Sequence, residues 1–329
     1  MEGGTNKERY RELCRSEPTI PIFSRDWWLD AVCGEDWDVA LVEKGGEVVG
    51  SLPYHFRKRL GTMVIMMPTL THTLGPWIKY PRSQKYHNRL SHENEVISAL
   101  IDSLPPHGYF EQRFHPSVTN WLPLYWKGFR QTTRYTYIIP DLGDLDKVWQ
   151  GVDKGLRRRI TKASESVRTV ETEDVRTFYD ITSYVWEKQG LRIPYSLDFI
   201  KRIDEACRDQ GRRRILAAVD ENDEVHAIDY TVWDDDKVHG LMSGISPKHR
   251  KDDSFKLLCW EALKFASEAG KSFDFGGSML SQIEELNRSF GAYQVPYFSV
   301  FKVDSLPIRA VEGGKRLLLP YMNKSTTPP

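Results

Sequence analysis

Two aspartates are the residues best suited to acid–base chemistry. Asp229 lies in the mostly apolar run of residues 226–231, and Asp274 lies between Phe273 and Phe275. Because an unpaired carboxylate is costly to bury, we expect Asp229 either to pair with an arginine or to act as a base. A carboxylate base can take the proton of an amine, directly or through water. For Asp274 the alternatives are a carboxylate that faces a cleft and a tight turn at a buried strand end.

Residues next to these aspartates are candidates for binding an acceptor substrate. Gly276 and Gly277 follow Asp274, and glycines permit positive φ and a close approach of backbone to a ligand. We assign Gly276, Gly277, Ser278 and Tyr230 to the acceptor side of a site.

The basic run at residues 154–162 predicts a cationic helix face. Apolar residues recur at helical spacing along it, which places Lys154, Arg158 and Lys162 on one stripe with Arg157 beside it. Such a stripe can grip a diphosphate, the 3′ end of a tRNA or a nucleotide-sugar donor. A solvated helix face is the alternative.

A second basic segment, residues 246–254, precedes another expected helix. Lys248 and Arg250 are suited to contact phosphate by charge. Asp252 and Asp253, which follow them, are typical of helix N-capping and would repel a phosphate.

In the first half of the chain, a long loop at residues 69–83 carries His72 and Trp77. Long loops in compact domains are often functional, so we assign His72 and Trp77 to the acceptor side. The alternative is an Ω-loop that is packed by its own side chains.

Composition narrows the class of protein. The chain has 329 residues, which predicts about two domains, and its 46 basic and 46 acidic residues give a net charge of zero. A balanced charge gives no general affinity for polyanions, so no DNA partner is expected. No apolar segment reaches the ~20 residues of a membrane span, and the start shows no signal region, so a cytoplasmic protein is expected.

The cysteines and histidines do not show the spacing of a metal site. Four widely separated cysteines predict reduced, buried thiols, with no metal and no disulfide: Cys14, Cys33, Cys207 and Cys259. His226 and His239 are isolated along the sequence and are expected at strand surfaces.

An internal repeat organises the chain. Residues 42–48 match residues 219–225 position for position, and both segments have the pattern of a β-hairpin. Upstream, residues 23–27 resemble residues 195–199, with Ser24 and Ser196 each placed as a helix N-cap. Two matches in the same order indicate a duplication.

The second copy predicts an α/β domain with a mixed sheet, an α+β sandwich layer. We expect two helices and then a meander of three strands at residues 215–219, 225–233 and 238–244. A helix at 254–269, a strand at 272–275, a helix at 280–290 and a strand at 297–303 should follow. The first copy predicts strands at 63–67 and 109–114 around a helix at 93–103. The expected segments are an N-terminal extension (1–19), a first, partial domain (20–140), a second domain (141–306) and a loosely held tail (307–329).

This order of elements resembles that of GNAT-type acyltransferases, and the tandem arrangement resembles the Fem-type branch. The resemblance extends over residues 21–302. It rests on Trp27, Gly50-Ser51-Leu52-Pro53, Gly75-Pro76, Leu156-Arg157-Arg158, and the segment from Phe273-Asp274-Phe275-Gly276-Gly277 to Phe290-Gly291-Ala292. The implied fold is two tandem GNAT-like domains, each a mixed, largely antiparallel sheet flanked by helices.

Two departures from the family pattern concern the donor site and a catalytic cation, for which Arg288 is our candidate. GNAT enzymes bind the coenzyme A pyrophosphate on a glycine-rich loop that opens a helix, and residues 246–254 contain no glycine. Asn287 stands where many relatives have lysine, and Arg288 beside it is a candidate substitute for that cationic role.

The resemblance implies an N-acyltransferase that moves an acyl or aminoacyl group from an activated donor to an amine. The donor would be acyl-CoA or aminoacyl-tRNA, with no covalently bound cofactor. The acceptor would be a small molecule, a peptide or a nucleotide-sugar, for example a cell-wall or polysaccharide precursor. The alternative is a non-catalytic tandem-GNAT binding protein, which Asn287 and the aspartates before Ser254 favour.

Overall fold

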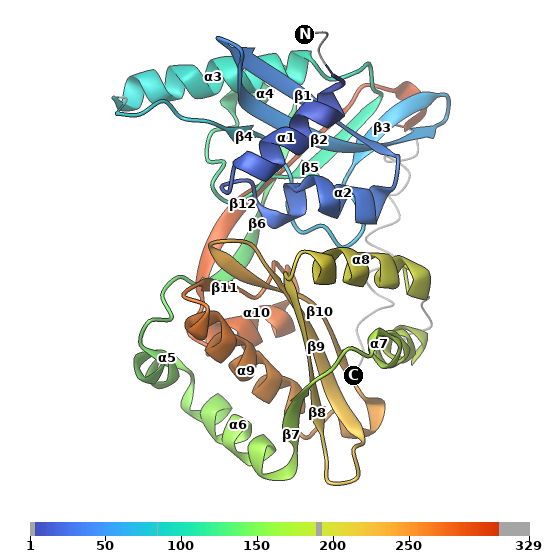
Figure 1. Cartoon of the computed structure of the whole chain (residues 1–329), viewed down its shortest axis with the longest axis vertical. Coiled ribbons are helices and arrows are strands. Elements are labelled where there is room, and N and C mark those ends of the chain that lie inside the picture. Colours follow the sequence, from blue (N-terminus) through green and yellow to red (C-terminus); the bar gives the residue numbers. More distant parts are fainter. Residues whose placement is uncertain (1–3, 84, 189–192, 309–329) are drawn as a thin grey trace. The chain divides into compact units, whose positions relative to one another are not determined.

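The computed structural model describes residues 4–83, 85–188 and 193–308, and the chain divides into two compact units. Unit 1 draws on Met1–Glu17, Cys33–Thr133 and Tyr297–Pro329, and unit 2 on Pro18–Val32 and Arg134–Pro296. Within these described ranges, no helix has the length and apolarity needed to cross a bilayer. Figure 1 labels the elements of both units.

The sheet of unit 1 has the strand order β1-β2-β3-β5-β12, with β4 paired to β2. The first three strands form an antiparallel meander, β5 runs parallel to β3, and β12 runs antiparallel to β5. The bounds are β1 Trp37–Lys44, β2 Glu47–Arg59, β3 Thr62–Met66, β4 Trp77–Ile78, β5 Tyr109–Arg113 and β12 Tyr293–Val303.

Helix α3 (Tyr86–Asp102) covers the sheet of unit 1 and buries its apolar stripe against β1 and β2. Helix and strand approach each other closely, because a Cβ on Gly50 of β2 would clash with the Val96 side chain of the helix. Helix α4 (Leu122–Trp126) packs on α3, and α1 (Asn6–Ser16) packs on β1. Helix α1 buries Tyr10 and Cys14, so residues 6–16 of the expected extension are part of the fold.

The sheet of unit 2 has the order β7-β8-β9-β10-β11-β6. It repeats the plan of unit 1, with an antiparallel meander β8-β9-β10, a parallel strand β11 and an antiparallel strand β6. The bounds are β6 Arg130–Ile139, β7 Arg168–Glu171, β8 Arg213–Val219, β9 Val225–Trp233, β10 Lys237–Ile245 and β11 Ser272–Asp274.

Helices lie on both faces of the sheet of unit 2 (Figure 1). Helix α9 (Ser254–Glu268) covers one face, and α5 (Leu145–Gly151), α6 (Lys154–Ser166) and α10 (Ser281–Ser289) join the core beneath it. Helices α7 (Val175–Lys188) and α8 (Leu197–Asp209) pack on the other face, through Phe178 and Asp204 against Tyr230 of β9. Unit 2 also includes the turn η1 (Ile22–Ser24) and helix α2 (Asp26–Cys33).

The expected duplication is confirmed in the strand pairings. In each unit the matching hairpin opens a meander, whose third strand pairs in parallel with the strand after the crossing helix. Both second strands carry a β-bulge at the aligned residues Val49 and His226, which the ladder skips. The expected strand at 225–233 and the helices at 254–269 and 280–290 appear within one or two residues of their predicted bounds.

Several expectations at the domain edges differ from the structure. Residues 20–32, which we placed in the first domain, belong to unit 2, and residues 297–306, which we placed in the second domain, belong to unit 1. The units divide at residues 133 and 134 rather than near 140. Helix α3 begins at Tyr86 instead of residue 93 because its first turn is polar and gives no apolar period. Ser196 caps α8 as expected, whereas Ser24 lies in η1 and α2 begins at Asp26. The part of the predicted tail beyond residue 308 lies outside the described residues.

Candidate active site

The sheet of unit 2 opens between two neighbouring parallel strands. Strands β10 and β11 pair over three residues only, the last pair being His239 and Asp274. Strand β11 ends there, while β10 continues to Ile245 past a bulge between Gly240 and Met242. The expected opening between adjacent strands is therefore present, and from Gly240 onward the edge of β10 has no partner strand on the β11 side among the described residues.

Asp229 lies buried on β9, beside the strand that forms this opening. Its side chain is on the face covered by α9, the face to which Ala227 also points, and only 6% of the residue is exposed. No cation lies within ion-pairing distance of Asp229 among the described residues, so the alternative of an arginine partner finds no support. Burial alone raises the pKa of Asp229 to about 7, which suits a base that works near neutral pH.

Ser243 connects Asp229 to the solvent side of β10. The two residues are directly opposed in the β9–β10 ladder, so their side chains share one face with Cβ atoms about 5 Å apart. Ser243 is exposed whereas Asp229 is buried. Ser243 is therefore an exposed hydroxyl-bearing residue directly across the ladder from the buried carboxylate.

Asp274 has a different environment on the opposite face. Its Oδ1 accepts hydrogen bonds from Thr136 Oγ1 at 2.5 Å and from the Gly276 amide at 2.9 Å. Its Oδ2 lies 3.9 Å from both Lys237 Nζ and His239 Nδ1. Asp274 thus holds the turn at Gly276, whose φ of 81° needs glycine, and the structure does not bring it together with Asp229.

The start of α9 carries its own acidic caps. Asp253 adopts the left-handed conformation and pairs with Arg159 of α6 at 2.8 Å and with Lys256. The Asp252 carboxylate accepts from the Ser254 amide at 3.1 Å. The helix N-terminus that would meet a donor phosphate is therefore bordered by two acids and two cations. Sequence reasoning missed Lys256, because a lysine in a first turn has no distinctive spacing.

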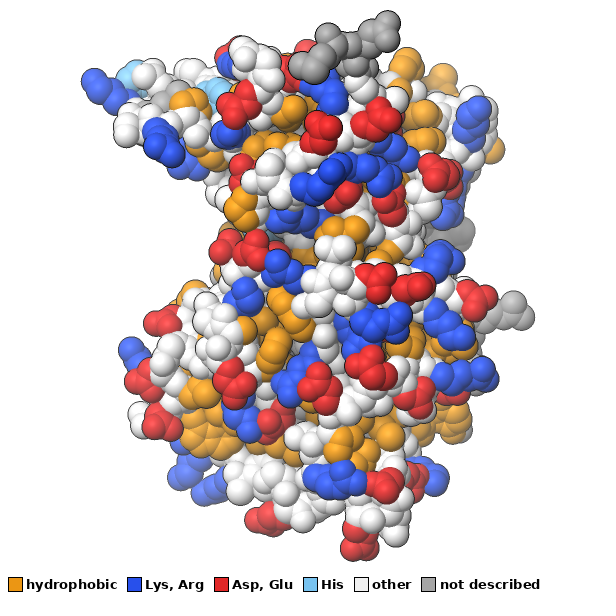
Figure 2. Space-filling view, in the orientation of Figure 1, with side chains coloured by type: hydrophobic (Ala, Val, Ile, Leu, Met, Phe, Trp, Pro, Cys, Tyr) orange, Lys and Arg blue, Asp and Glu red, His pale blue; other side chains and the backbone are white. Residues whose placement is uncertain are grey.

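The basic helix α6 has the predicted orientation. Leu156 and Ile160 are buried in the core with α9, whereas Arg158 and Lys162 are exposed and have no carboxylate partner among the described residues. Arg157 is half-buried, and its Nε has no partner in that part of the chain. Figure 2 shows positive and negative side chains interspersed on the visible face of the molecule, as the balanced composition predicts.

The remaining predicted donor and catalytic cations are exposed on short elements. Lys248 lies in the turn η2 (Pro247–His249) and pairs with Glu224 at 2.8 Å, and Arg250 follows this turn. Arg288 pairs with Glu284 one turn earlier on α10 at 3.0 Å. These local ion pairs would have to open before Lys248 or Arg288 could bind a substrate.

The predicted acceptor residues fall into three environments. His72 and Trp77 belong to unit 1, where Trp77 is buried in β4. Tyr230 is fully buried in unit 2 and donates its hydroxyl to Asp204 at 3.0 Å, so it faces the core and not a ligand. Gly277 and Ser278 lie after β11 at the strand opening, with Gly277 exposed.

Unit 2 also contains a cavity that the sequence did not indicate. It has a volume of about 700 Å³ and lies between α7 and the start of α8. Its wall carries hydroxyl groups, one carboxylate and the apolar edge of the segment before α8: Tyr179, Asp180, Ser183, Tyr184, Ile193, Pro194, Tyr195 and Ser196. The Ser183 hydroxyl is buried and has no partner in the described part of the chain. Scattered tyrosines on two helices leave no linear motif, so only the fold brings them together.

Comparison with known proteins identifies the type of domain that carries this site. Residues 151–285 match the family model described as an acetyltransferase (GNAT) domain. That range contains Asp229, α9 and the opening between β10 and β11. A search of the curated proteins found no match for the sequence.

Solved structures of similar fold extend the likeness to nearly the whole chain. FemX has a TM-score of 0.67 at 13% identity and covers 94% of this chain and 99% of its own. L-PGS from Bacillus licheniformis has a TM-score of 0.54 at 12% identity, with coverages of 94% and 97%. A tandem GNAT protein from the clavulanic acid biosynthesis pathway has a TM-score of 0.51 at 12% identity, with coverages of 90% and 93%. Residues 151–285 thus match an acetyltransferase (GNAT) domain, and the fold of the chain is similar to that of FemX and of the tandem GNAT protein.

Proposed function

We propose that the protein is an N-acyltransferase that moves an acyl or aminoacyl group from an activated donor to an amine. The observation that carries the proposal is the opening of β10 from β11 beside a buried, unpaired carboxylate, within the segment that matches a GNAT domain. An exposed strand edge supplies backbone N–H groups that can hold the acyl oxygen and stabilise the oxyanion as the amine attacks.

Asp229 is the base in this proposal. Its pKa of about 7 leaves a large share of the carboxylate ionised at neutral pH, and Ser243 relays the proton from the strand opening. As the amine nitrogen bonds to the acyl carbon, its proton passes to Asp229 through Ser243. The bond from the acyl carbon to the donor then breaks, and the same proton is returned to the leaving thiolate or alkoxide, so that the donor leaves as a thiol or an alcohol. Asp274 instead orders the turn of Gly276 and Ser278, where the acceptor would lie.

The donor binds on the α6 and α9 side of unit 2. Arg158 and Lys162 supply two uncompensated positive charges there, and Arg159 and Lys256 lie at the start of α9. Acyl-CoA and aminoacyl-tRNA both present phosphates, so both donors fit this chemistry. The tandem GNAT relative whose description names AcCoA favours acyl-CoA as the first donor to test.

The cavity between α7 and α8 binds part of the acceptor substrate in this proposal. Its hydroxyl groups and Asp180 suit a polar molecule that carries an amine, such as a peptide or a sugar-linked precursor. Burial raises the pKa of Tyr195 to about 12, so its hydroxyl remains a hydrogen-bond donor throughout the physiological range.

A non-catalytic binding protein is the second candidate. The start of α9 favours it. There the Ser254 amide donates to Asp252, and Arg159 and Lys256 pair with Asp253, so the groups that would bind a pyrophosphate already have partners. Such a protein would bind an acceptor in the cavity without transferring a group.

The discriminating experiment measures acetyl-CoA affinity and transfer to a panel of amines. The variant Asp229→Asn should retain donor affinity and lose about 10²–10⁴-fold in kcat, the usual contribution of a general base. The matched control is Asp198→Asn on the exposed start of α8, which should leave kcat unchanged. A wild-type protein that binds acetyl-CoA but transfers to no amine would support the binding protein.

The donor surface has its own test. Replacing both Arg158 and Lys162 by alanine should weaken acetyl-CoA binding by at least 100-fold, because each charge-assisted contact contributes about 1.5–3 kcal/mol, and the remaining affinity should respond less to salt. A double alanine variant of Lys147 and Lys201, exposed lysines on α5 and α8, is the matched control. Equal affinities in both double variants would remove α6 from the site.

A further inference from the structure

A cluster of two histidines and an aspartate lies at one end of the sheet of unit 2, where its aspartate borders the start of α9 on the proposed donor side. His226 Nδ1 is 2.6 Å from Asp252 Oδ2, and His249 Nδ1 is 3.4 Å from the same oxygen. One ligand atom from each residue lies within 4.8 Å of the other two. We propose that His226, His249 and Asp252 bind a divalent transition-metal ion, with Zn²⁺ as the best match.

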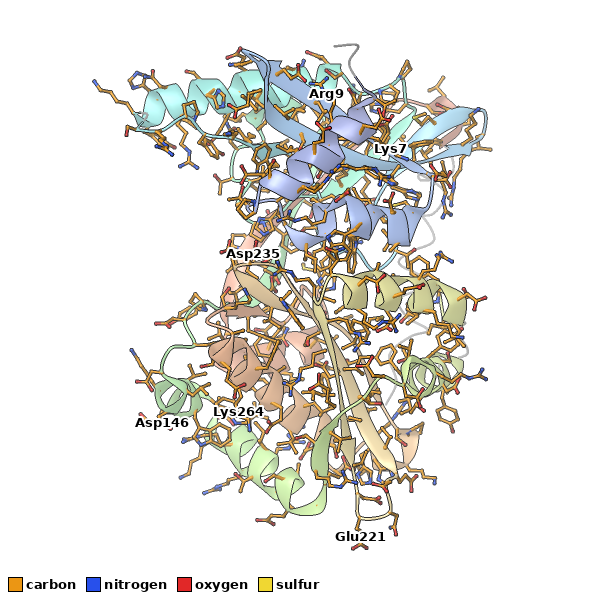
Figure 3. The ribbon with its side chains drawn as sticks, viewed as in Figure 1. Lys7, Arg9, Asp146, Glu221, Asp235 and Lys264 are labelled. Atoms are coloured by element: carbon orange, nitrogen blue, oxygen red, sulfur yellow. The ribbon has the colours of Figure 1, made fainter. Side chains whose placement is uncertain are left out.

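The fold positions these three residues from separate elements. His226 is the bulged residue of β9, and a bulge re-aims a side chain out of the regular ladder. Its carbonyl accepts a hydrogen bond from the Ser246 amide at 2.8 Å, which holds the segment of η2 against β9. His249 ends η2, and Asp252 precedes α9. The cluster lies at the end of the sheet where the β8–β9 turn carries Glu221, labelled in Figure 3.

Ser254 holds the second oxygen of Asp252, and a carboxylate lies near the second ring nitrogen of each histidine, although neither of these nitrogens is hydrogen-bonded among the described residues. Asp252 Oδ1 accepts from the Ser254 amide at 3.1 Å and from the Ser254 hydroxyl at 2.6 Å, which leaves Oδ2 for the ion. His226 Nε2 lies 3.5 Å from Asp220 Oδ2, and His249 Nε2 lies 3.4 Å from Glu224 Oε1. A histidine ligand that directs its other ring nitrogen to a carboxylate is the usual arrangement in metal sites.

Charge and donor type select the ion. Asp220, Glu224 and Asp252 bring three negative charges to the cluster, against one positive charge on Lys248, which pairs with Glu224. The excess negative charge favours a cation. Two imidazole nitrogens and one carboxylate oxygen match the ligands of Zn²⁺ sites, in which water completes the coordination.

The two imidazole rings lie face to face without the ion. Their centroids are 3.4 Å apart and their planes differ by 11°, so their nitrogen lone pairs run nearly parallel and do not yet converge. The His249 side chain is 21% exposed and sits on a short turn, which gives it room to rotate toward a shared ion. Metal binding should therefore separate the rings.

The site would fasten the start of α9 to β9. The expectation that the chain binds no metal rested on linear spacing, and the 22 residues between His226 and His249 hide the cluster in the sequence. Burial also differs from expectation, because His226 and His239 are 7% and 4% exposed instead of lying at the strand surface.

The test titrates chelator-treated full-length protein with Zn²⁺ and Co²⁺, followed by calorimetry and by the visible absorption of bound Co²⁺. We expect one ion per chain and a melting temperature that rises with Zn²⁺ concentration. His249→Ala should abolish saturable binding, and Glu224→Gln, which alters only an orienting carboxylate, should weaken it by about 10–100-fold. His87→Ala, an exposed histidine of unit 1, should bind as the wild type does.

Two results would overturn the proposal. The first is no stoichiometric binding by the wild type, which would leave a hydrogen-bonded histidine–carboxylate cluster only. The second is unchanged affinity in both His249→Ala and Glu224→Gln. The Glu224 side chain is 42% exposed, so Glu224→Gln should not disturb the fold. Its affinity for Zn²⁺ therefore tests the proposal even if His249→Ala folds poorly.

Discussion

Leu52 and Asp229 occupy the same place in the two copies of the duplicated fold. Each lies three residues after the β-bulge of the second strand and faces the helix that crosses the meander. Both are buried, with exposed fractions of 1% and 6%. Unit 1 places a leucine in this core, whereas unit 2 places an ionisable group there at a cost in stability. A buried ionisable residue in one copy and a leucine in the other agree with our proposal that Asp229 of unit 2 is the base.

The interior of unit 2 also contains more buried charged side chains than the interior of unit 1. Among the described residues of unit 1, Glu93 is the buried carboxylate, and it lies near the surface of α3 beside Arg89. Unit 2 buries Asp204, Arg213, Asp229 and Asp274. Both units therefore share one scaffold, and unit 2 carries more buried charged side chains in its interior.

The largest expected effect comes from making unit 1 resemble unit 2. Leu52→Asp should destabilise the protein by more than about 4 kcal/mol at pH 8, because it removes apolar burial and buries an unpaired charge. Urea denaturation measures the loss. Leu52→Met, which conserves volume, should cost less than about 1.5 kcal/mol. A tolerated aspartate at position 52 would mean that the two cores do not differ as described.

Replacing Asp229 by asparagine should stabilise the protein, and the gain should depend on pH. Its pKa is about 7 in the folded protein and near the ordinary 3.8 in the unfolded chain, so the folded state binds the proton more tightly. Stability should fall as the pH rises from about 4 to about 7, and the full cost is present above pH 7. The stability gained by Asp229→Asn should therefore be larger at pH 8 than at pH 4 by about 4 kcal/mol, at roughly 1.4 kcal/mol per pKa unit.

Denaturation of both proteins at several pH values measures this difference. Asp198→Asn, at an exposed position of α8, is the control and should show no such trend. If the free energy of unfolding had the same pH dependence in the wild type and in Asp229→Asn, Asp229 would be ionised at little cost. The proposed contrast with Leu52 would then be wrong.

The third prediction concerns the paired charges of unit 2. Asp204 of α8 and Arg213 of β8 form an ion pair at 2.9 Å with side chains that are 6% and 4% exposed. Asp204→Ala should cost about 3–5 kcal/mol, because it leaves a buried guanidinium and the Tyr230 hydroxyl without this partner. Glu173 is the other carboxylate partner of Arg213, and its side chain is 69% exposed. Glu173→Ala should therefore cost less than about 1 kcal/mol. Equal losses would show that the burial of Asp204 has no special weight.

Periodicity predicted most of the fold because each long element buries one face. The strand at 225–233 and the helix at 254–268 have continuous apolar patterns and were found nearly to the residue. Helix α1 and strand β7 were missed, since α1 buries only Tyr10 and Cys14 and β7 has four residues.

The pairing of charged side chains in unit 2 could not be predicted from periodicity. Asp204 and Arg213 lie on different elements, and their pairing depends on how α8 packs on β8. The sequence also could not decide whether Asp229 is paired, because that depends on every side chain around it. Composition and spacing therefore predicted which residue types the site contains, and the tertiary structure determined which of them meet.

The smallest effect tests whether local capping contributes equally in the two units. Thr5 caps α1 of unit 1 in a reciprocal arrangement with Glu8, and Ser196 caps α8 of unit 2 by accepting from the Phe199 amide. Each alanine variant should cost about 1 kcal/mol, because it leaves an N-terminal amide without its acceptor. Thermal unfolding of Thr5→Ala and Ser196→Ala measures both values, and an exposed serine within a helix, Ser164→Ala, is the control. If Thr5→Ala has no effect while Ser196→Ala does, α1 is a marginal addition to unit 1, and the stability of that copy rests on the meander and α3.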